Sequence, residues 1–175
     1  FNNLGIVYKE LEDFDSAIEA FNNAVKIKPD YAEAYNNLGI LYKESGQVNK
    51  AFESFQKAID LMPEYDEAHN NIGILFMSLG QIEKAIESYN NAIKINKNFI
   101  EAINNLGIAL MDLGQIEEAI SYYQKAIAID NNFALTFNNL GIAYKHLNNQ
   151  DAAAKCYKKA LILDTNYSDA FSNYG

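Results

Sequence analysis

One five-residue sequence, Asn-Asn-Leu-Gly-Ile, recurs along this chain of 175 residues at a fixed spacing of 34. Copies begin at Asn2, Asn36, Asn70, Asn104 and Asn138, with Ile in place of Leu in the third. A fixed period of this length is typical of repeat arrays, in which each unit is one small supersecondary element. We therefore expect an array of stacked units and not a globular enzyme domain.

The period divides the chain into one array over residues 1–175. The expected repeats are 1–31 (partial), 32–65, 66–99, 100–133, 134–167 and 168–175, the last a stub. Because the chain begins and ends inside a repeat, we expect it to be part of a longer protein. Positions within the unit are counted from 1 at Ala32 to 34 at Tyr65.

Each unit has the pattern of two helices. In residues 33–45 and 49–61 of the second unit, apolar residues recur three and four residues apart, which is the period of an amphipathic helix. Gly46 lies between these segments and can adopt the positive φ that favours a helix end. Pro63 follows the second segment and cannot continue a helix. The unit is therefore predicted to be a helix, a tight turn and an antiparallel second helix.

Small residues recur where the two helices should touch. Position 8 is glycine in every unit that reaches it, and positions 20 and 27 are alanine. Glycine inside a helix costs about 1 kcal/mol relative to alanine, so its repetition indicates close packing of backbone against a neighbour. Position 24 is always aromatic and position 11 is Tyr, Phe or Leu, so large side chains should fill the space beside the small ones.

These residues resemble the pattern of the tetratricopeptide repeat (TPR) family over the whole chain. The second unit matches at Tyr35, Leu38, Gly39, Tyr42, Gly46, Ala51, Phe55, Ala58 and Pro63. The resemblance implies an all-α fold, a right-handed superhelical solenoid of antiparallel helix pairs whose first helices line the concave face. The chain departs from the pattern at position 15, where Glu12 and Asn148 replace glycine, and we expect looser turns there.

Two rows of asparagine run along the predicted first helices. Position 6 provides Asn3, Asn37, Asn71, Asn105 and Asn139, and position 5 provides Asn36, Asn70 and Asn104 among others. Asparagine is a mediocre helix former, so helix propensity does not explain the rows. Their amides, which both donate and accept hydrogen bonds, would suit the backbone of an extended peptide. The alternative is a structural bond to the neighbouring repeat.

An apolar row should share this face. Position 9 is always isoleucine, and position 12 is methionine in the two middle repeats. The candidate floor of a binding groove is Ile40, Ile74, Ile108, Met77 and Met111. Methionine adapts to irregular partners. The competing interpretation is that the isoleucines only pack against the next repeat.

Charge and composition exclude several classes of function. The net charge is −9 and the chain has no arginine, which argues against binding nucleic acid or an anionic membrane. No apolar run approaches the roughly 18 residues of a membrane span. His69, His146 and Cys156 have no metal-ligand spacing, and no catalytic motif is present. We expect no enzyme activity, no metal and no cofactor, and a cytoplasmic location.

The sequence therefore predicts a protein-interaction module that binds a protein or peptide in its concave groove. An alternative is suggested by the run Asn-Asn-Leu-Gly-Ile-Leu-Tyr-Lys-Glu-Ser-Gly at Asn36. It resembles the TPR arms of O-linked N-acetylglucosamine transferase-like proteins, which implies a substrate-recognition arm whose catalytic domain lies outside these residues. A third role is end-to-end self-association through the open ends of the solenoid.

Overall fold

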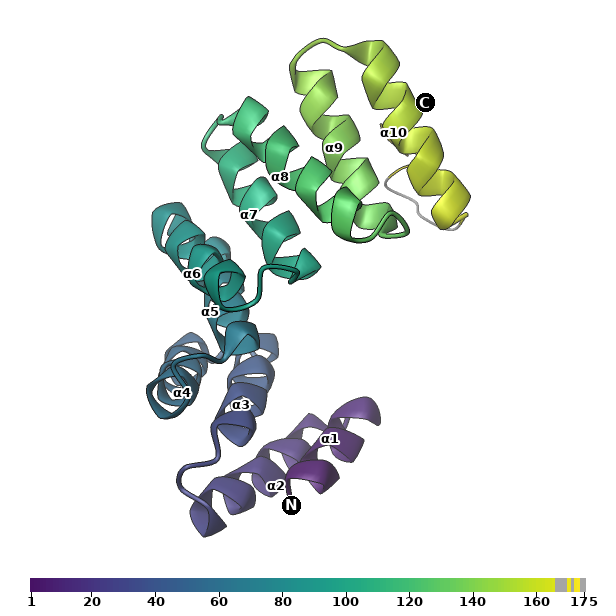
Figure 1. Cartoon of the computed structure of the whole chain (residues 1–175). Coiled ribbons are helices and arrows are strands. Elements are labelled where there is room, and N and C mark those ends of the chain that lie inside the picture. Colours follow the sequence, from purple (N-terminus) through teal and green to yellow (C-terminus); the bar gives the residue numbers. More distant parts are fainter. Residues whose placement is uncertain (166–169, 171, 174–175) are drawn as a thin grey trace. The chain divides into compact units, whose positions relative to one another are not determined.

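The computed structural model describes residues 1–165, 170, 172 and 173. Within these residues the chain forms ten α-helices joined by short turns, and no strand (Figure 1). The chain divides into two compact units, Phe1–Ile95 and Asn96–Gly175. The all-α solenoid fold that the sequence predicted is confirmed. Most of the predicted stub at 168–175 lies outside the described residues.

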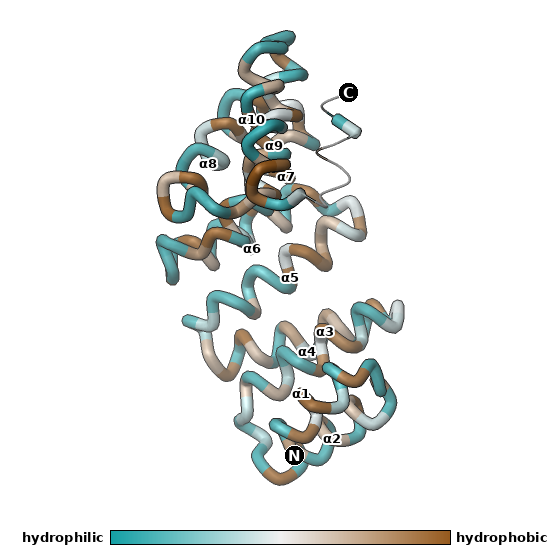
Figure 2. The backbone as a smooth tube through the Cα atoms, turned by 90° about the vertical axis from the view of Figure 1, so that its right-hand side faces the viewer, coloured by the Kyte–Doolittle hydropathy of each residue, from teal (hydrophilic) through white to brown (hydrophobic). Residues whose placement is uncertain are grey.

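The first unit contains three helix pairs. Their bounds are α1 Asn2–Glu10, α2 Phe14–Ile27, α3 Ala32–Glu44, α4 Val48–Leu61, α5 Asp66–Ser78 and α6 Ile82–Ile95. The predicted segments 33–45 and 49–61 correspond to α3 and α4 within one residue at each end. Apolar and polar stretches alternate along the helices, so each pair has one face for the core and one for solvent (Figure 2).

The second unit contains two helix pairs. Their bounds are α7 Ile100–Asp112, α8 Ile116–Ile129, α9 Ala134–His146 and α10 Gln150–Leu163. Each first helix packs against its own second helix, and α8 also packs against α9 of the following repeat. This nearest-neighbour packing is what a solenoid requires, because a single 34-residue repeat buries too little surface to fold alone.

The repeated glycine is the point where the two helices of a repeat approach most closely. A Cβ atom added to Gly39 on α3 would lie 2.5 Å from Cδ1 of Phe55 on α4, and at Gly73 it would lie 2.6 Å from Cε1 of Tyr89. These distances are shorter than carbon atoms tolerate. The ring at position 24 therefore lies flat against the backbone of the first helix, as the glycine pattern predicted.

The prediction of looser turns at position 15 is wrong. Glu12 and Asn148 both adopt φ of 58°, the left-handed conformation that Gly46 adopts at 72°. The same backbone hydrogen bond closes each turn, from Asp13 N to Tyr8 O at 2.9 Å and from Asn149 N to Tyr144 O at 2.9 Å. The geometry of the helix pair demands this turn, so residues with a Cβ adopt it at a cost in strain.

Candidate functional site

The two first helices of the second unit form a cavity of about 250 Å³ between them. Its lining residues are Ile108, Met111 and Asp112 from α7, Asn139, Ile142 and His146 from α9, and Tyr123 from α8. Three predicted partner-binding residues, Ile108, Met111 and Asn139, thus lie at one site. The cavity is smaller than the roughly 300–1,000 Å³ of sites for small-molecule ligands, so its size suits a single side chain.

The isoleucines of position 9 have two roles in the structure. Ile6 packs against the core cluster that contains Leu38 and Leu41 of the next repeat, and Ile40 packs against Ile72 and Leu75 in the same way. All five isoleucines of the row remain only half-buried. Ile6 and Ile40 therefore join neighbouring repeats through one side and leave the other side partly exposed.

The two asparagine rows are joined by hydrogen bonds between repeats. At four places along the chain, the position 6 amide donates from Nδ2 to Oδ1 of position 5 in the repeat before. The bonds are Asn37 to Asn2 at 3.4 Å, Asn71 to Asn36 at 3.0 Å, Asn139 to Asn104 at 3.2 Å and Asn173 to Asn138 at 3.1 Å. The bond to the neighbouring repeat that the sequence left open as an alternative is thus present.

The two rows differ in burial. Asn36, Asn70 and Asn104 at position 5 are buried, with 4%, 6% and 1% of their surface exposed. Asn36 also donates from Nδ2 to the Tyr65 hydroxyl at 3.5 Å, so both ends of its amide are engaged. A ligand lying on the first helices would therefore meet the half-buried amides of position 6 and not these three.

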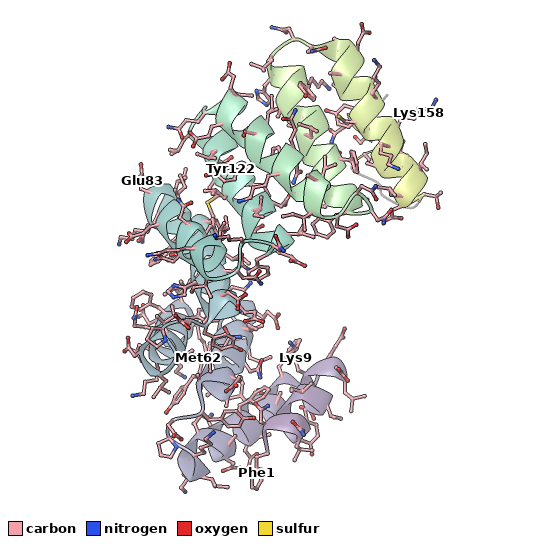
Figure 3. The ribbon with its side chains drawn as sticks, viewed as in Figure 1. Phe1, Lys9, Met62, Glu83, Tyr122 and Lys158 are labelled. Carbon is pink, nitrogen blue, oxygen red and sulfur yellow. The ribbon has the colours of Figure 1, made fainter. Side chains whose placement is uncertain are left out.

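The remaining predicted residues also lie on the first helices of their repeats. Asn3 is exposed, whereas Asn37, Asn71, Asn105, Ile74 and Met77 are half-buried. Lys9, the residue of α1 at the position that Met77 and Met111 occupy later, is also half-buried (Figure 3). A charged lysine in place of methionine makes the face of the first repeat more polar than that of the fourth.

Sequence reasoning missed the most buried residue of the cavity lining, Tyr123. Position 24 is phenylalanine in the first two repeats and tyrosine in the next three, a change that only adds a hydroxyl group. A Cβ added to Gly107 would meet Cε1 and Cζ of Tyr123, so the far end of the ring passes the backbone of α7. The hydroxyl on Cζ therefore emerges on the cavity side of that helix.

The electrostatics of Tyr123 reflect this position. Burial, and then the nearby charge of Asp112, raise the pKa of Tyr123 above its usual range, and no hydrogen bond contributes to the shift. The phenol therefore stays protonated and can both donate and accept a hydrogen bond. Asp112 and His146, which are exposed at the ends of α7 and α9, form the polar rim of the cavity.

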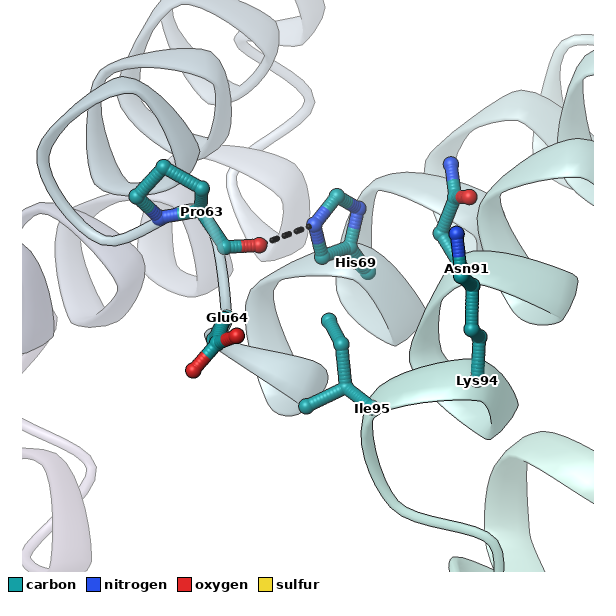
Figure 4. A pocket seen from close by; sticks show the side chains of 6 residues that line it. All are labelled: Pro63, Glu64, His69, Asn91, Lys94 and Ile95. Atoms are coloured by element: carbon teal, nitrogen blue, oxygen red, sulfur yellow. Dashed lines mark hydrogen bonds between the residues drawn. The ribbon is translucent and has the colours of Figure 1, made fainter.

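A larger cavity of about 460 Å³ lies in the first unit, between the turn after α4, α5 and the end of α6. It is lined by Pro63, Glu64, His69, Asn91, Lys94 and Ile95 (Figure 4). The His69 ring nitrogen Nε2 lies 3.0 Å from the carbonyl oxygen of Pro63, an exposed contact that ties α5 to the turn before it. This cavity contains no predicted site residue, and its charged residues face solvent.

In the described part of the chain, no group of three or more His, Cys, Asp or Glu residues could hold a metal ion. No helix among the described residues is long and apolar enough to cross a membrane.

Comparison with known proteins gives a consistent result. A family model described as TPR repeat matches residues 5–46, 41–80, 75–114 and 107–148, and one described as tetratricopeptide repeat matches 134–167. No curated protein matches the sequence significantly.

Three solved structures illustrate the similarity. MamA is 30% identical with a TM-score of 0.79, over 93% of this chain and 95% of MamA. YrrB, described as a TPR protein with an unusual peptide-binding site, is 23% identical with a TM-score of 0.75, over 98% of this chain and 88% of YrrB. TTC0263 of Thermus thermophilus is 22% identical with a TM-score of 0.81, over 99% of this chain and 94% of TTC0263.

Proposed function

Because the chain belongs to the tetratricopeptide repeat family, we propose that it is a protein-interaction module that binds an extended peptide along its first helices. The cavity between α7 and α9 carries this proposal, because it combines an apolar wall, a half-buried amide and a volume that suits one side chain. Similar sites with few polar groups and apolar walls are the usual form of a recognition pocket. YrrB, which shares the fold, is described as having a peptide-binding site.

The asparagine row can serve both roles that the sequence left open. An amide has two donor hydrogens and an acceptor oxygen with two lone pairs. The bond from Asn139 to Asn104 uses one hydrogen of Asn139. The second hydrogen and the oxygen remain for a peptide backbone, and the bond to Asn104 holds the amide in place. Such an arrangement lowers the entropy lost on binding.

The test begins with selection of peptides from a random displayed library against the whole chain, followed by calorimetry with the most enriched peptide. Ile108→Ser removes part of the apolar wall, and a buried isoleucine contributes about 1.5–3 kcal/mol. We expect binding to weaken by roughly tenfold or more. The matched control is Ile162→Ser on α10, where the side chain is 65% exposed.

The role of the asparagine row is tested in the same experiment. Asn139→Ala should weaken each selected peptide by a similar amount, about 0.5–1.5 kcal/mol per folded molecule, because backbone contacts do not depend on peptide sequence. The variant should also lose about 1–3 kcal/mol of stability, because Oδ1 of buried Asn104 loses its donor. Equal binding by Ile108→Ser and the unchanged protein, or a selection without enrichment, would contradict the proposal.

The half-buried amides also suit the narrower role of a substrate-recognition arm for a sugar transferase. In that role the residues described here would hold the substrate backbone, while catalysis would require a domain outside them. Proteins captured on the chain would then be enriched in O-linked sugar, and a capture without such enrichment would argue for the scaffold role alone.

A further inference from the structure

The Tyr123 hydroxyl is a polar group at the base of the cavity between α7 and α9. Only 1% of the Tyr123 surface is exposed, yet the residue lines the space between α7 and α9. No hydrogen bond involving this hydroxyl is present among the described residues, and none contributes to the raised pKa of Tyr123. The hydroxyl is not one of the fully buried side-chain atoms that lack a hydrogen-bond partner, which are Oγ1 of Thr136 and the hydroxyl of Tyr157 among the described residues. It therefore opens to the cavity. A ligand that fills the cavity without bonding to the hydroxyl would bury it without a partner, at a cost of about 1–3 kcal/mol.

The surroundings of this hydroxyl specify the chemistry of that atom. The walls of the cavity are aliphatic, from Ile108, Met111 and Ile142, so the stem of the incoming side chain must be apolar. The Asp112 carboxylate lies close enough to Tyr123 to affect its proton equilibrium. A cation placed between the carboxylate and the phenol oxygen would donate to both, which is the favourable charge-assisted case.

We propose that this cavity is a specificity pocket for a long basic side chain, lysine or arginine, of the bound peptide. The methylene stem lies along the isoleucines and the methionine, and the cationic end reaches the Tyr123 oxygen and the Asp112 carboxylate. Long basic side chains commonly bury their stems along apolar surface in this way. The net charge of −9 adds a general attraction for a basic peptide.

Other types of side chain would fit this cavity less well than a basic one. An aliphatic side chain of the same length would fill the volume but leave the hydroxyl without a partner. An acidic side chain would face Asp112 at short range in a partly buried site, where like charges repel strongly. A basic side chain is the type that satisfies the walls, the hydroxyl and the carboxylate together. This inference rests on the proposed peptide-binding function.

The experiment uses short extended peptides that are identical except for a central lysine, norleucine, glutamine or glutamate. Their binding to the whole chain is followed by NMR of the methionine methyl groups. The chain has three methionines, Met62, Met77 and Met111. Met111 lines the pocket. Met77, at the same position of the preceding repeat, reports binding elsewhere along the first helices, and Met62, which follows α4, reports non-specific effects.

The lysine peptide should shift the Met111 signal saturably and bind roughly tenfold more tightly than the norleucine peptide, the size expected for one charge-assisted hydrogen bond. Asp112→Asn should remove most of this preference. Tyr123→Phe should reduce it severalfold with the fold intact, because Phe21 and Phe55 occupy the same position in the first two repeats. Tyr89→Phe is the matched control in the third repeat and should leave the preference unchanged.

Three results would overturn the pocket assignment. They are tighter binding of norleucine than lysine, an unchanged preference in Asp112→Asn, and no saturable shift of Met111 with the lysine peptide. The proposed function has a separate readout, the library selection. A selection that enriches peptides without lysine or arginine, bound in a manner sensitive to Ile108→Ser, would reject the basic pocket and retain peptide binding.

Discussion

At the scale of single residues, backbone strain at position 15 is accompanied by a helix cap from the next residue. Gly46, Gly80 and Gly114 adopt positive φ at this turn without a Cβ. Where Glu12 and Asn148 replace glycine, the next residue caps the second helix. Asp13 Oδ1 accepts from Ser16 N at 3.2 Å, and Asn149 Oδ1 accepts from Ala152 N at 3.2 Å. Gln47 and Gln115, which follow glycine, make no such cap.

The strain predicts a stabilising substitution. The left-handed conformation destabilises a non-glycine residue by about 1–2 kcal/mol. Glycine removes this strain, but it also raises the conformational entropy of the unfolded chain, which offsets about 0.4–1 kcal/mol of the gain. Glu12→Gly should therefore stabilise the chain by about 0.5–1 kcal/mol in a denaturant titration. Asn148→Gly should gain less, because asparagine tolerates this conformation. Glu10→Gly, at the end of α1, is the matched control and should destabilise; a gain there equal to that of Glu12→Gly would contradict the argument.

At the scale of elements, the pairing of two helices depends on one glycine and one ring. Gly39 and Phe55 belong to α3 and α4, and their contact leaves no room for a methyl group. Alanine is the better helix former, so helix propensity and packing predict opposite effects of a substitution at this site. Packing should dominate, because Phe55 is fully buried and protein interiors are close-packed.

Gly39→Ala is therefore expected to destabilise the chain by about 1–3 kcal/mol, the typical cost of overpacking. Phe55→Leu leaves space beside the new methyl group, so the double variant should lose less than the sum of the two single losses. Hydrogen exchange should show the loss of protection concentrated in α3 and its neighbours, since contacts in a solenoid are local. Additive losses in the double variant would mean that the glycine and the ring do not share one contact.

At the scale of the whole molecule, the buried tyrosines make alkaline pH the informative condition for stability. Burial first, and then the charges of Glu67 and Glu33, raise the pKa of Tyr65 to about 12 from 10.0, although the hydrogen bond from Asn36 acts in the opposite direction. The unfolded chain therefore loses this proton at lower pH than the folded chain. Stability from this group is fully present below about pH 10 and is lost as the pH rises through 12.

Tyr65→Phe should thus flatten the fall in stability between pH 10 and pH 12, measured by denaturant titration at each pH. Phenylalanine fits this position, because Phe99 and Phe133 occupy it in later repeats. Tyr31→Phe, the same change one repeat earlier, is the matched control. An equal flattening by both variants would show that the surroundings of Tyr65 do not cause the effect. Burial also raises the pKa of Tyr89 and Tyr123, so part of the fall should persist.

The sequence by itself determined the repeat length, the helix pairs, the contact at Gly39 and the family. Each of these follows from spacing within one repeat, which a period of 34 displays directly. It also identified Ile108, Met111 and Asn139 as residues of one face, because position in a helix fixes direction. It left open a bond from the asparagines to the neighbouring repeat, but it did not identify position 5 as the acceptor or indicate that Asn36 would be buried.

The tertiary structure decided those features, because they depend on how closely one repeat packs against the next. The bond from Asn71 to Asn36 joins residues 35 apart in the chain, and only the distance between α5 and α3 brings the two amides together. Tyr123 differs from the phenylalanines at the same position of the first two repeats by one oxygen atom, and the sequence does not indicate where that atom points. Its place in the cavity follows from the gap between α7 and α9, a property of stacked repeats and not of either helix alone.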